Sequence, residues 1–510
     1  MIVFVAVVSG LAARSIGVTR SFDWRNSSGA FSFGMDWHQA DYVQIARNYW
    51  RDGLDMLHPR IDWRADTPGW VEMELPVIPW LAAAVYRELG YDEAVLRWLV
   101  WAASVAMLGL FALFTRQSGL APAAAAFAVV AMAVNPIAVM LSVAPQPEPW
   151  SQSLSLGSMM LVWRWLESPS RPGLLAAAAL LAAAALVKAP AAACGLVLAW
   201  AVWRRYGWRL LLVPEVWLAA LVAVAPPAAW YLWARRFWTI YGNSLGVSNE
   251  THLLSAGMLW PPAFLAHIGF WETVGVFSPT GWVLGFAALT VRSPQRDFAL
   301  VWYGAVLAFY VVAADTAGDG WASYYHVAST APACLLMGLG FGALRDGTVS
   351  EWIPGLSAER ARWTGMVLAV CTLAVLAATT AGALWLREVR GNGEALYECV
   401  RAARAHVPED GWILLRGGSK VDGHGHPVAW DDSRFFAWMD RRGFVYPAED
   451  AGLSTLESFR SRGARFWLAQ PGELRDEAVQ RAAGGWRVVW HCEGLLDVYD
   501  MGAQAGAPGP

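Results

Sequence analysis

The sequence predicts an α-helical integral membrane protein with a small α/β domain at its C-terminal end. Of its 510 residues, 56% are hydrophobic and only 15% are charged, whereas a typical soluble domain has about 45–50% apolar and about 25% charged residues. Apolar runs fill most of the chain up to residue 387, and charged residues return after it. The net charge of -3 excludes the basic surface that binds nucleic acid, so we expect no nucleic-acid partner.

Apolar runs long enough to cross a membrane recur up to residue 387. A spanning helix needs about 20 predominantly apolar residues, because the lipid interior offers its backbone no hydrogen-bond partners. About eleven runs meet this description, near residues 2–20, 95–115, 121–142, 151–167, 173–189, 190–205, 211–233, 279–291, 297–314, 325–343 and 363–386. Arg14 interrupts the first run, for which a cleaved signal peptide is the alternative to a membrane span.

Basic residues in the short loops predict the orientation of these runs. Loops rich in Lys and Arg usually stay in the cytoplasm, and the arginines fall in alternate loops, as at Arg116, Arg171, Arg204, Arg292 and Arg345. With an odd number of spans, the N-terminus is then cytoplasmic. The segments expected outside are 21–94, 143–150, 234–278, 315–324 and the chain after residue 387.

The C-terminal region, residues 388–510, has the composition of a domain that lies in water. Helical and strand-like runs alternate in it, namely Ala395–His406, Trp412–Leu415, Leu453–Arg462, Phe466–Ala469 and Trp486–Trp490. This alternation predicts a small α/β domain outside the membrane. The last residues, 502–510, are mostly Gly, Ala and Pro, and we expect them to be disordered.

Five cysteines are scattered along the chain without the paired spacing of zinc or redox motifs. Cys194, Cys334 and Cys371 lie in apolar runs, where cysteine usually behaves as a small hydrophobic residue. Cys399 and Cys492 lie in the polar C-terminal region, and the sequence leaves open whether they form a disulfide.

Lysine is rare, since only Lys188 and Lys420 occur among the 38 basic residues. Lys188 falls near the outer end of an apolar run, and a lysine inside the apolar region costs about 2.5–3.5 kcal/mol on insertion scales. Because of this cost such a residue is usually paired or functional, and we expect it to bind a phosphate. The alternative is that its side chain reaches the lipid headgroups along the helix surface.

The first outer loop, residues 21–94, is too long for a simple connection, and long ordered loops are usually functional. Apolar residues at helical spacing between Met35 and Leu54 predict an amphipathic helix that lies in the membrane interface. Asp36 and Asp41 are expected at or before the N-terminus of this helix, where its dipole favours negative charge. Each of the two is either a helix cap or a functional carboxylate.

The residues of this loop resemble a known group of enzymes. Trp37–Asp41 followed by Ile45–Asn48 resembles the bacterial membrane glycosyltransferases of the GT-C superfamily. Pro59–Asp62 and Val71–Pro76 are similar to one branch of it, related to protein O-mannosyltransferases and the lipid A aminoarabinose transferase (glycosyltransferase family 39). The resemblance covers roughly residues 20–390.

Three further segments resemble the same superfamily. Ala144–Trp150 is similar to its short acidic second outer loop, in which Glu148 takes the acidic position. Leu186–Pro190 resembles its lysine-containing segment, and Ser323–His326 resembles a Tyr-Tyr segment that many relatives share. The resemblance therefore implies a GT-C fold for the membrane domain, residues 1–387, in which we include the first outer loop with its interfacial helices.

The resemblance also implies an activity, that of an inverting glycosyltransferase that moves a sugar from a polyprenyl-phosphate donor to an acceptor. The transfer is expected on the outer, periplasmic face of the bacterial inner membrane, and the acceptor is a lipid, a glycan or a protein. The residue types suit that chemistry on physical grounds as well. A positioned carboxylate can act as general base for an acceptor hydroxyl, and a cation can stabilise the charge of the leaving phosphate.

Carboxylates and cations on the outer side are therefore the candidate site residues. We expect Asp41 to be the general base, with Asp36 as the alternative. Lys188 is expected to bind the donor phosphate, with Arg47 and Arg60 as weaker candidates. The other candidates for substrate binding are Glu74, Glu148, Tyr324, Tyr325 and His326. Glu148 or Glu74 is expected to position the acceptor or a divalent cation, and the sequence leaves the use of a metal open.

Three other functions remain as alternatives, and the third is a non-enzymatic sensor that uses the outer C-terminal domain. A secondary transporter would carry ionisable groups near the middle of the membrane in broken helices, often in two related halves. Here the acids concentrate in the outer loops and no repeat is evident. A polysaccharide polymerase or ligase also handles polyprenyl-linked sugars, but its key polar residues are expected in a later outer loop.

Overall fold

The computed structural model describes residues 2–19, 36–246, 262–312, 323–389, 394–421 and 430–504. The chain forms two compact units. The first, here called the helical unit, comprises residues 1–21, 94–232 and 252–387, and the second, the mixed unit, comprises residues 22–93, 233–251 and 388–510. The first outer loop thus belongs with the C-terminal region, whereas the sequence analysis grouped it with the membrane helices.

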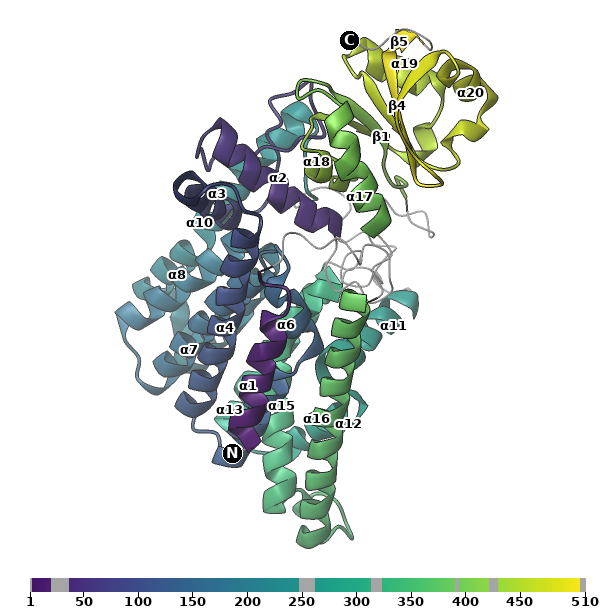
Figure 1. Cartoon of the computed structure of the whole chain (residues 1–510). Coiled ribbons are helices and arrows are strands. Elements are labelled where there is room, and N and C mark those ends of the chain that lie inside the picture. The colour runs from purple at the N-terminus through teal and green to yellow at the C-terminus, as the bar shows by residue number, and fades with distance from the viewer. Residues whose placement is uncertain are drawn as a thin grey trace. The chain divides into compact units, whose positions relative to one another are not determined.

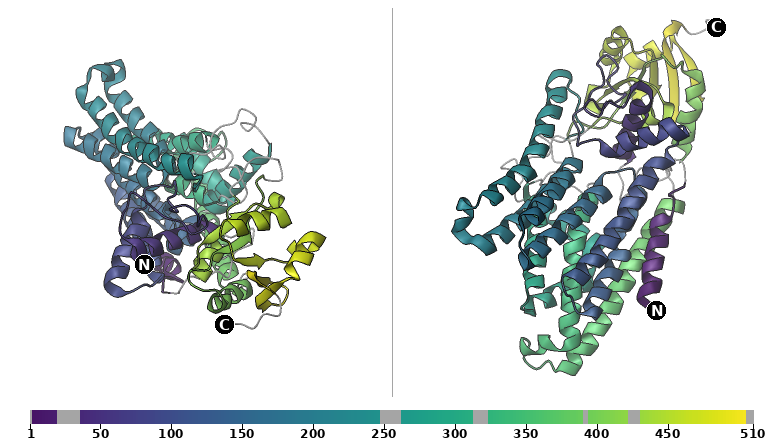
Figure 2. Two further views of the ribbon diagram at one scale, coloured as in Figure 1. Left: turned by 90° about the horizontal axis from the view of Figure 1, so that it is seen from above. Right: turned by 90° about the vertical axis from the view of Figure 1, so that its left-hand side faces the viewer.

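The helical unit is a bundle of helices that run side by side in both views (Figure 1, Figure 2). Its helices are α1 (Ile2–Ser15), α4 (Ala94–Gln117), α5 (Pro122–Ala133), α6 (Pro136–Met140), α7 (Glu148–Glu167), α8 (Arg171–Val187), α9 (Cys194–Tyr206), α10 (Pro214–Tyr241), α11 (Pro262–Trp271), α12 (Pro279–Ala287), α13 (Pro294–Val312), α15 (Val327–Asp346) and α16 (Ala358–Val389). Short 3₁₀ turns connect several of them, including η1 (Leu141–Val143), η2 (Ala189–Ala193) and η6 (Ser323–His326). Helix α7 packs against α4 and α8, and α15 packs against α5, α12 and α13.

Every predicted apolar run is at least partly helical, but eleven membrane spans are not confirmed. Among the described residues, four helices are long and apolar enough to cross a membrane: Ala94–Gln117, Pro214–Tyr241, Ser323–Asp346 and Ala358–Arg387. Two bent pairs raise the number to six if each pair is one span. The first pair bends by 49° between Ala133 and Pro136, and the second by 84° between Phe277 and Pro279.

The second bend corrects the expectation that residues 234–278 form an outer loop. Helix α10 continues to Tyr241, and α11 passes into a single π-helical segment, η4 (Glu272–Phe277). Ser278 then turns the chain with a φ of 67° and accepts a hydrogen bond from the Gly281 amide with its side chain. The apolar run before Pro279 is therefore the first half of a broken helix. The rest of the predicted loop, residues 247–261, lies outside the described residues.

Arg14, which interrupts the first predicted span, is fully buried in α1. Its guanidinium donates hydrogen bonds to the carbonyl oxygens of Gly10, Met132 and Ala133. Met132 and Ala133 end α5, where the last carbonyl groups lack partners in their own helix. The arginine therefore joins α1 to α5.

The mixed unit combines six helices with one five-stranded sheet in its described part. The helices are α2 (Asp36–Asp52), α3 (Val77–Leu89), α17 (Glu394–Ala403), α18 (Arg434–Met439), α19 (Leu453–Ser461) and α20 (Glu477–Ala483). The strands are β1 (Ile413–Arg416), β2 (Gly443–Tyr446), β3 (Phe466–Ala469), β4 (Trp486–Cys492) and β5 (Leu496–Gln504). In the strand order β2-β1-β3-β5-β4, β1 is parallel to β2 and β3, and β5 is antiparallel to β3 and β4.

The predicted strands correspond to β1, β3 and β4, and the predicted helices to α17 and α19. The sequence analysis missed β2 and β5. Strand β5 reaches Gln504, so the expectation of a disordered tail from residue 502 is wrong at its start. Residues 505–510 lie outside the described part.

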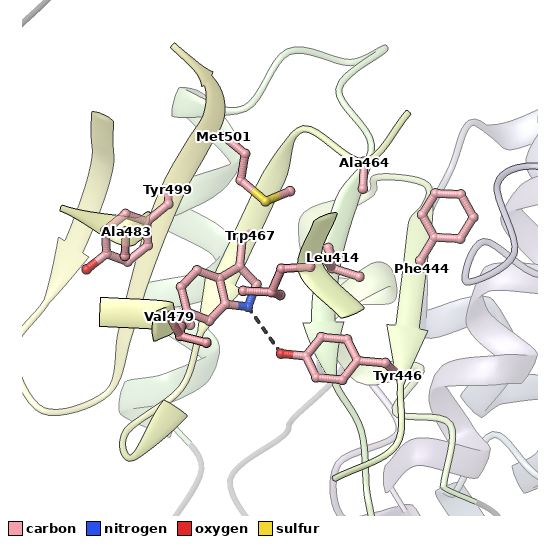
Figure 3. Close-up of a cluster of buried hydrophobic side chains, with 11 residues drawn as sticks. Leu414, Phe444, Tyr446, Ala464, Trp467, Val479, Ala483, Tyr499 and Met501 are labelled. Carbon is pink, nitrogen blue, oxygen red and sulfur yellow. Dashed lines mark hydrogen bonds between the residues drawn. The ribbon is translucent and has the colours of Figure 1, made fainter. Parts of the chain in front are cut away.

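Aromatic side chains fill the core of the sheet domain (Figure 3). Trp467 of β3 lies among Leu414, Tyr446, Val479 and Tyr499, from neighbouring strands and α20. Its indole nitrogen donates to the Tyr446 hydroxyl at 3.3 Å, and that hydroxyl donates to the buried carboxylate of Glu473 at 2.6 Å. Both polar groups in this apolar core are therefore satisfied, as buried Trp and Tyr usually are.

Cys399 and Cys492 form a disulfide, which answers the question that the sequence left open. It joins α17 to β4 across a sequence separation of 93 residues. Disulfides persist mainly in oxidising compartments outside the cytoplasm.

Candidate functional site

A buried ion pair marks the candidate site in the helical unit. Lys188 caps the C-terminal end of α8, and Glu148 is the first residue of α7. Lys188 Nζ lies 3.3 Å from Glu148 Oε1, and the two residues are only 5% and 2% exposed. The lysine side chain is therefore buried and does not extend to the protein surface.

Two tyrosine rings face the same ammonium. Tyr324 and Tyr325 belong to η6, and their ring centroids lie 5.4 Å and 5.7 Å from Lys188 Nζ. At these distances the ring faces attract a cation, most strongly where water is excluded. Three segments far apart in sequence thus bring Glu148, Lys188 and the tyrosine pair together in one cluster.

His326, the next residue along the chain, forms a second buried pair. Its Nδ1 lies 2.7 Å from Glu272 Oε1, and both side chains are buried. Glu272 Oε1 also accepts a hydrogen bond from Ser329 Oγ at 2.7 Å, and Oε2 accepts one from the Tyr303 hydroxyl at 2.8 Å. The sequence analysis missed Glu272, because it treated residues 234–278 as a loop. A single acid inside the apolar run Phe264–Phe277 was the signal that could have identified it.

The two broken helices meet close to this second pair. Asn135 caps α6 by accepting a hydrogen bond from the Ala138 amide, and its Nδ2 donates to the Val276 carbonyl at 3.2 Å. Helix breaks leave backbone groups without partners, and within a membrane these must be satisfied by the protein. The Asn135 side chain satisfies one such group at each break.

Residues on either side of Lys188 in the chain line an apolar cavity, and Lys188 itself is not one of the lining residues. The cavity has a volume of about 550 Å³ and lies between α8, η2, α9 and α10, lined by residues that include Leu181, Ala185, Ala189, Gly195, Pro227 and Tyr231. Its lining is almost entirely apolar, and the Tyr231 hydroxyl donates to the Ala185 carbonyl at 2.7 Å. Ala185 lies in the last turn of α8, and Ala189 directly follows Lys188 in the chain. The cavity therefore reaches the C-terminal end of α8, which Lys188 caps.

Asp41 lies in the mixed unit, in the second turn of α2, and is 2% exposed. It is therefore not the cap of that helix. Burial raises the pKa of Asp41 well above its usual range; the nearby carboxylates of Asp431 and Asp432 add to the shift, and a hydrogen bond with Ser433 opposes it. No partner for Asp41 Oδ1 occurs among the described residues. Helix α2 begins at Asp36, whose side chain is not described.

The polar face of α2 is buried in the mixed unit, whereas we expected it to face water at the membrane interface. Arg47 donates to Asp62 Oδ2 and to the Ala437 carbonyl, both at 3.0 Å, and its Nε lies 2.9 Å from Asp440 Oδ1. Asn48 donates to Asp62 Oδ1 at 3.0 Å. These contacts join α2 to the chain around Asp62 and to α18, and they occupy the guanidinium of Arg47.

The other predicted residues of the mixed unit have separate surroundings. Arg60 donates to Asp52 Oδ2 at 3.0 Å near the surface. Glu72 accepts a hydrogen bond from Ser244 Oγ at 2.6 Å, and Glu74 is buried two residues further on. Among the described residues, no group of three or more His, Cys, Asp or Glu side chains could hold a metal ion.

The comparisons with known proteins agree with the fold. The family model for dolichyl-phosphate-mannose-protein mannosyltransferase matches residues 66–233. No curated protein matches the chain. The structure of ArnT from Cupriavidus metallidurans bound to undecaprenyl phosphate is similar over 99% of both chains, with a TM-score of 0.64 and 16% identity.

Two other solved structures are similar at lower scores. The oligosaccharyltransferase AglB from Archaeoglobus fulgidus, in complex with an inhibitory peptide and a dolichol-phosphate, covers 99% of this chain and 75% of its own, with a TM-score of 0.52 and 11% identity. The arabinofuranosyltransferase AftD from Mycobacteria covers 99% of this chain and 42% of its own, with a TM-score of 0.53 and 13% identity. The chain therefore has the GT-C fold, and the resemblance to the GT-C superfamily is confirmed.

Proposed function

We propose that this chain of the GT-C superfamily is an inverting glycosyltransferase that moves a sugar from a polyprenyl-phosphate donor to an acceptor on the outer face of the membrane. The observation that carries the proposal is the buried ammonium of Lys188. An apolar cavity, lined by residues that precede and follow Lys188 in the chain, supports it. A polyprenyl phosphate has the two matching parts, an anionic head and a long apolar chain. Undecaprenyl phosphate in the ArnT structure and dolichol-phosphate in the AglB structure support this class of donor.

The charge balance of the cluster suits a phosphate. Glu148 offsets the charge of Lys188 in the absence of a ligand, so the buried lysine is not left uncompensated. An ammonium has three N–H donors and can contact a carboxylate and a phosphate together. Hydrogen bonds between charged groups are roughly twice as strong as neutral ones. Lys188 would thus stabilise the phosphate as the bond to the sugar breaks.

The proposed general base is Asp41. A base works best when its pKa lies near the working pH, and the raised pKa of this buried carboxyl moves it in that direction. Direct attack by an acceptor hydroxyl that gives its proton to this carboxylate would invert the sugar. Asp36 remains the alternative, and Glu148 or Glu74 is proposed to position the acceptor or a divalent cation.

The outer-face location rests on two independent features. Arginines recur in alternate short loops, which favours a cytoplasmic N-terminus. The Cys399–Cys492 disulfide favours an oxidising compartment for the C-terminal domain. The bacterial inner membrane, with the C-terminal domain in the periplasm, fits both.

A transporter is the second candidate, because the two bent helix pairs and the buried Glu272 are features that transporters also have. One experiment separates the two functions. Purified protein in proteoliposomes is given radiolabelled polyprenyl-phosphate sugars and native membrane acceptors, with Asp41→Asn as the variant. Label on an acceptor that requires Asp41 supports the proposal. Solute flux without transfer from any donor would support the transporter instead.

A further inference from the structure

The carboxylate of Glu272 is unusually well bound for an acid in an apolar helix. It lies in the π-helical segment η4 and is 1% exposed. His326, Ser329 and Tyr303 all contact it within 2.8 Å. π-Helical segments inside helices are rare and occur frequently at functional sites, and ionisable groups within membrane segments are functional candidates by default.

These contacts anchor the turn that carries the tyrosine pair. His326 directly follows Tyr325 in η6, and Ser329 lies one turn further on in α15. The Tyr310 hydroxyl donates to the Tyr325 carbonyl and to Ser329 Oγ, both at 3.3 Å, and the Tyr310 ring lies 4.7 Å from the His326 ring. The network therefore holds the chain at Tyr325 and directly after it.

We propose that Glu272 and His326 are positioning residues that hold Tyr324 and Tyr325 over the Lys188 ammonium and so set its affinity for a phosphate. The effect on the affinity of Lys188 for a phosphate rests on the proposed function. Glu272 and His326 act through the two rings, 5.4 Å and 5.7 Å from Lys188 Nζ.

The physical reason is preorganisation. A lysine side chain has four flexible bonds, and each that must be ordered on binding weakens the affinity. Two ring faces and a carboxylate restrict the ammonium before the ligand arrives. Apolar side chains at positions 272 and 326 would fill the same space, but they would not fix the direction of η6. Apolar contacts have no preferred direction, whereas hydrogen bonds between paired groups do.

The two lysines of the chain permit a direct test. Full-length protein labelled with ¹³C at lysine Cε should give two main signals, one from buried Lys188 and one from exposed Lys420. Protons above aromatic faces resonate upfield, so we expect the Lys188 signal upfield of the Lys420 signal. Lys188→Arg assigns the signals, and Tyr324→Leu combined with Tyr325→Leu should remove the upfield displacement.

The decisive variants are His326→Asn and His326→Leu. Asparagine keeps an N–H donor close to the place of Nδ1, whereas leucine keeps only the bulk. We expect His326→Asn to retain the upfield displacement and His326→Leu to lose it. Tyr303→Phe is the matched control. It removes the hydrogen bond to Glu272 Oε2, whereas His326 and Ser329 contact Oε1, so it should leave the Lys188 signal in place. A wild-type unfolding temperature reports that each variant is folded.

Titration with undecaprenyl phosphate then tests whether Lys188 binds a phosphate. Undecaprenol, the same lipid without the phosphate, is the control. Only undecaprenyl phosphate should move the Lys188 signal. His326→Leu should weaken the Kd for undecaprenyl phosphate by roughly thirtyfold, the size of one desolvated cation–π contact. A Lys188 signal in His326→Leu that keeps the wild-type upfield displacement would overturn the positioning role while leaving the donor site intact. A second outcome separates the two claims. If His326→Leu loses the upfield displacement of the Lys188 signal, the positioning role is supported. If the wild-type Lys188 signal does not respond to undecaprenyl phosphate, the phosphate site is overturned.

Discussion

Lys188 Nζ lies 3.3 Å from Glu148 Oε1, although 40 positions separate the two residues in the chain. The hairpin of α7 and α8 brings them together, because Glu148 begins the first helix and Lys188 caps the second. An acid at a helix N-terminus and a base at a helix C-terminus both interact favourably with the helix dipoles. The same geometry thus stabilises the hairpin and holds a cation beside the apolar cavity.

Replacing the lysine alone should damage both stability and transfer. Lys188→Met leaves Glu148 buried without its cation, and breaking one side of a buried pair costs about 3–5 kcal/mol. Lys188→Met combined with Glu148→Gln should recover most of that stability. Sugar transfer should stay at least roughly 10²-fold below wild type, as when one stabilising donor is removed from an active site.

Thermal unfolding and initial transfer rates measure the two effects separately. Lys420→Met is the matched control, since this exposed lysine pairs with Asp450 at the surface of the mixed unit. Wild-type rates in the double variant would remove Lys188 from the mechanism.

The raised pKa of Asp41 predicts opposite pH effects on stability and on transfer. The folded protein binds this proton more tightly than the unfolded chain does. The resulting stabilisation is full below the unfolded pKa and is lost as the pH rises through the raised folded pKa. The ionised form needed by a base appears over that same rise, so transfer should increase as stability falls.

Asp41→Asn cannot titrate, so its unfolding temperature should lack this pH dependence and should equal or exceed that of wild type at neutral pH. Transfer should be lost over the whole range. Unfolding curves recorded from about pH 4 to pH 8 provide the comparison. A strongly destabilised Asp41→Asn protein at neutral pH would indicate a structural role for the carboxylate.

The disulfide predicts a measurable stability of the C-terminal domain. Cys399→Ala with Cys492→Ala should lower the free energy of unfolding by about 2–5 kcal/mol, because the bond closes a long loop in the unfolded chain. The tryptophans of the sheet core, such as Trp467, provide the fluorescence signal. Cys371→Ala is the control, since this exposed cysteine is not in the disulfide. Equal stability of the two variants would contradict the prediction.

The contacts of Arg14 predict that a lysine at this position cannot stabilise the fold as the arginine does. Arg14→Lys should not replace it, because only the planar guanidinium can donate to Gly10, Met132 and Ala133 together. Each buried group left without a partner costs about 1–3 kcal/mol. Thermal unfolding of Arg14→Lys and Arg14→Met should therefore show similar losses. A lysine variant as stable as wild type would mean that the ammonium satisfies these carbonyls equally well.

Local patterns predicted much of the fold. Apolar runs of helical length identified the bundle, and runs of aromatic and branched residues identified β1, β3 and β4. The short strand β2 was missed because Gly443–Tyr446 has too few residues for a pattern. Strand β5 was missed because acidic residues interrupt it.

Local patterns in the sequence also predicted part of the site. Lys188 and Glu148 stand out in sequence because each is a lone charge beside an apolar run. Glu272 was missed because its partners, Tyr303, His326 and Ser329, come together only in the folded bundle. The periodicity of α2 indicates two faces but does not tell what covers the polar one, since Ala437 lies 390 positions from Arg47.

The most direct test of the account is photo-crosslinking of a polyprenyl phosphate that carries a photoreactive group on its apolar chain. We expect crosslinks to residues that line the cavity of α8, α9 and α10, such as Ala189 and Pro227. Undecaprenyl phosphate should compete and undecaprenol should not, and Lys188→Met with Glu148→Gln should abolish the crosslinks while Lys420→Met retains them. Crosslinks outside this cavity, or equal competition by undecaprenol, would contradict the assignment of Lys188 as the donor's phosphate ligand.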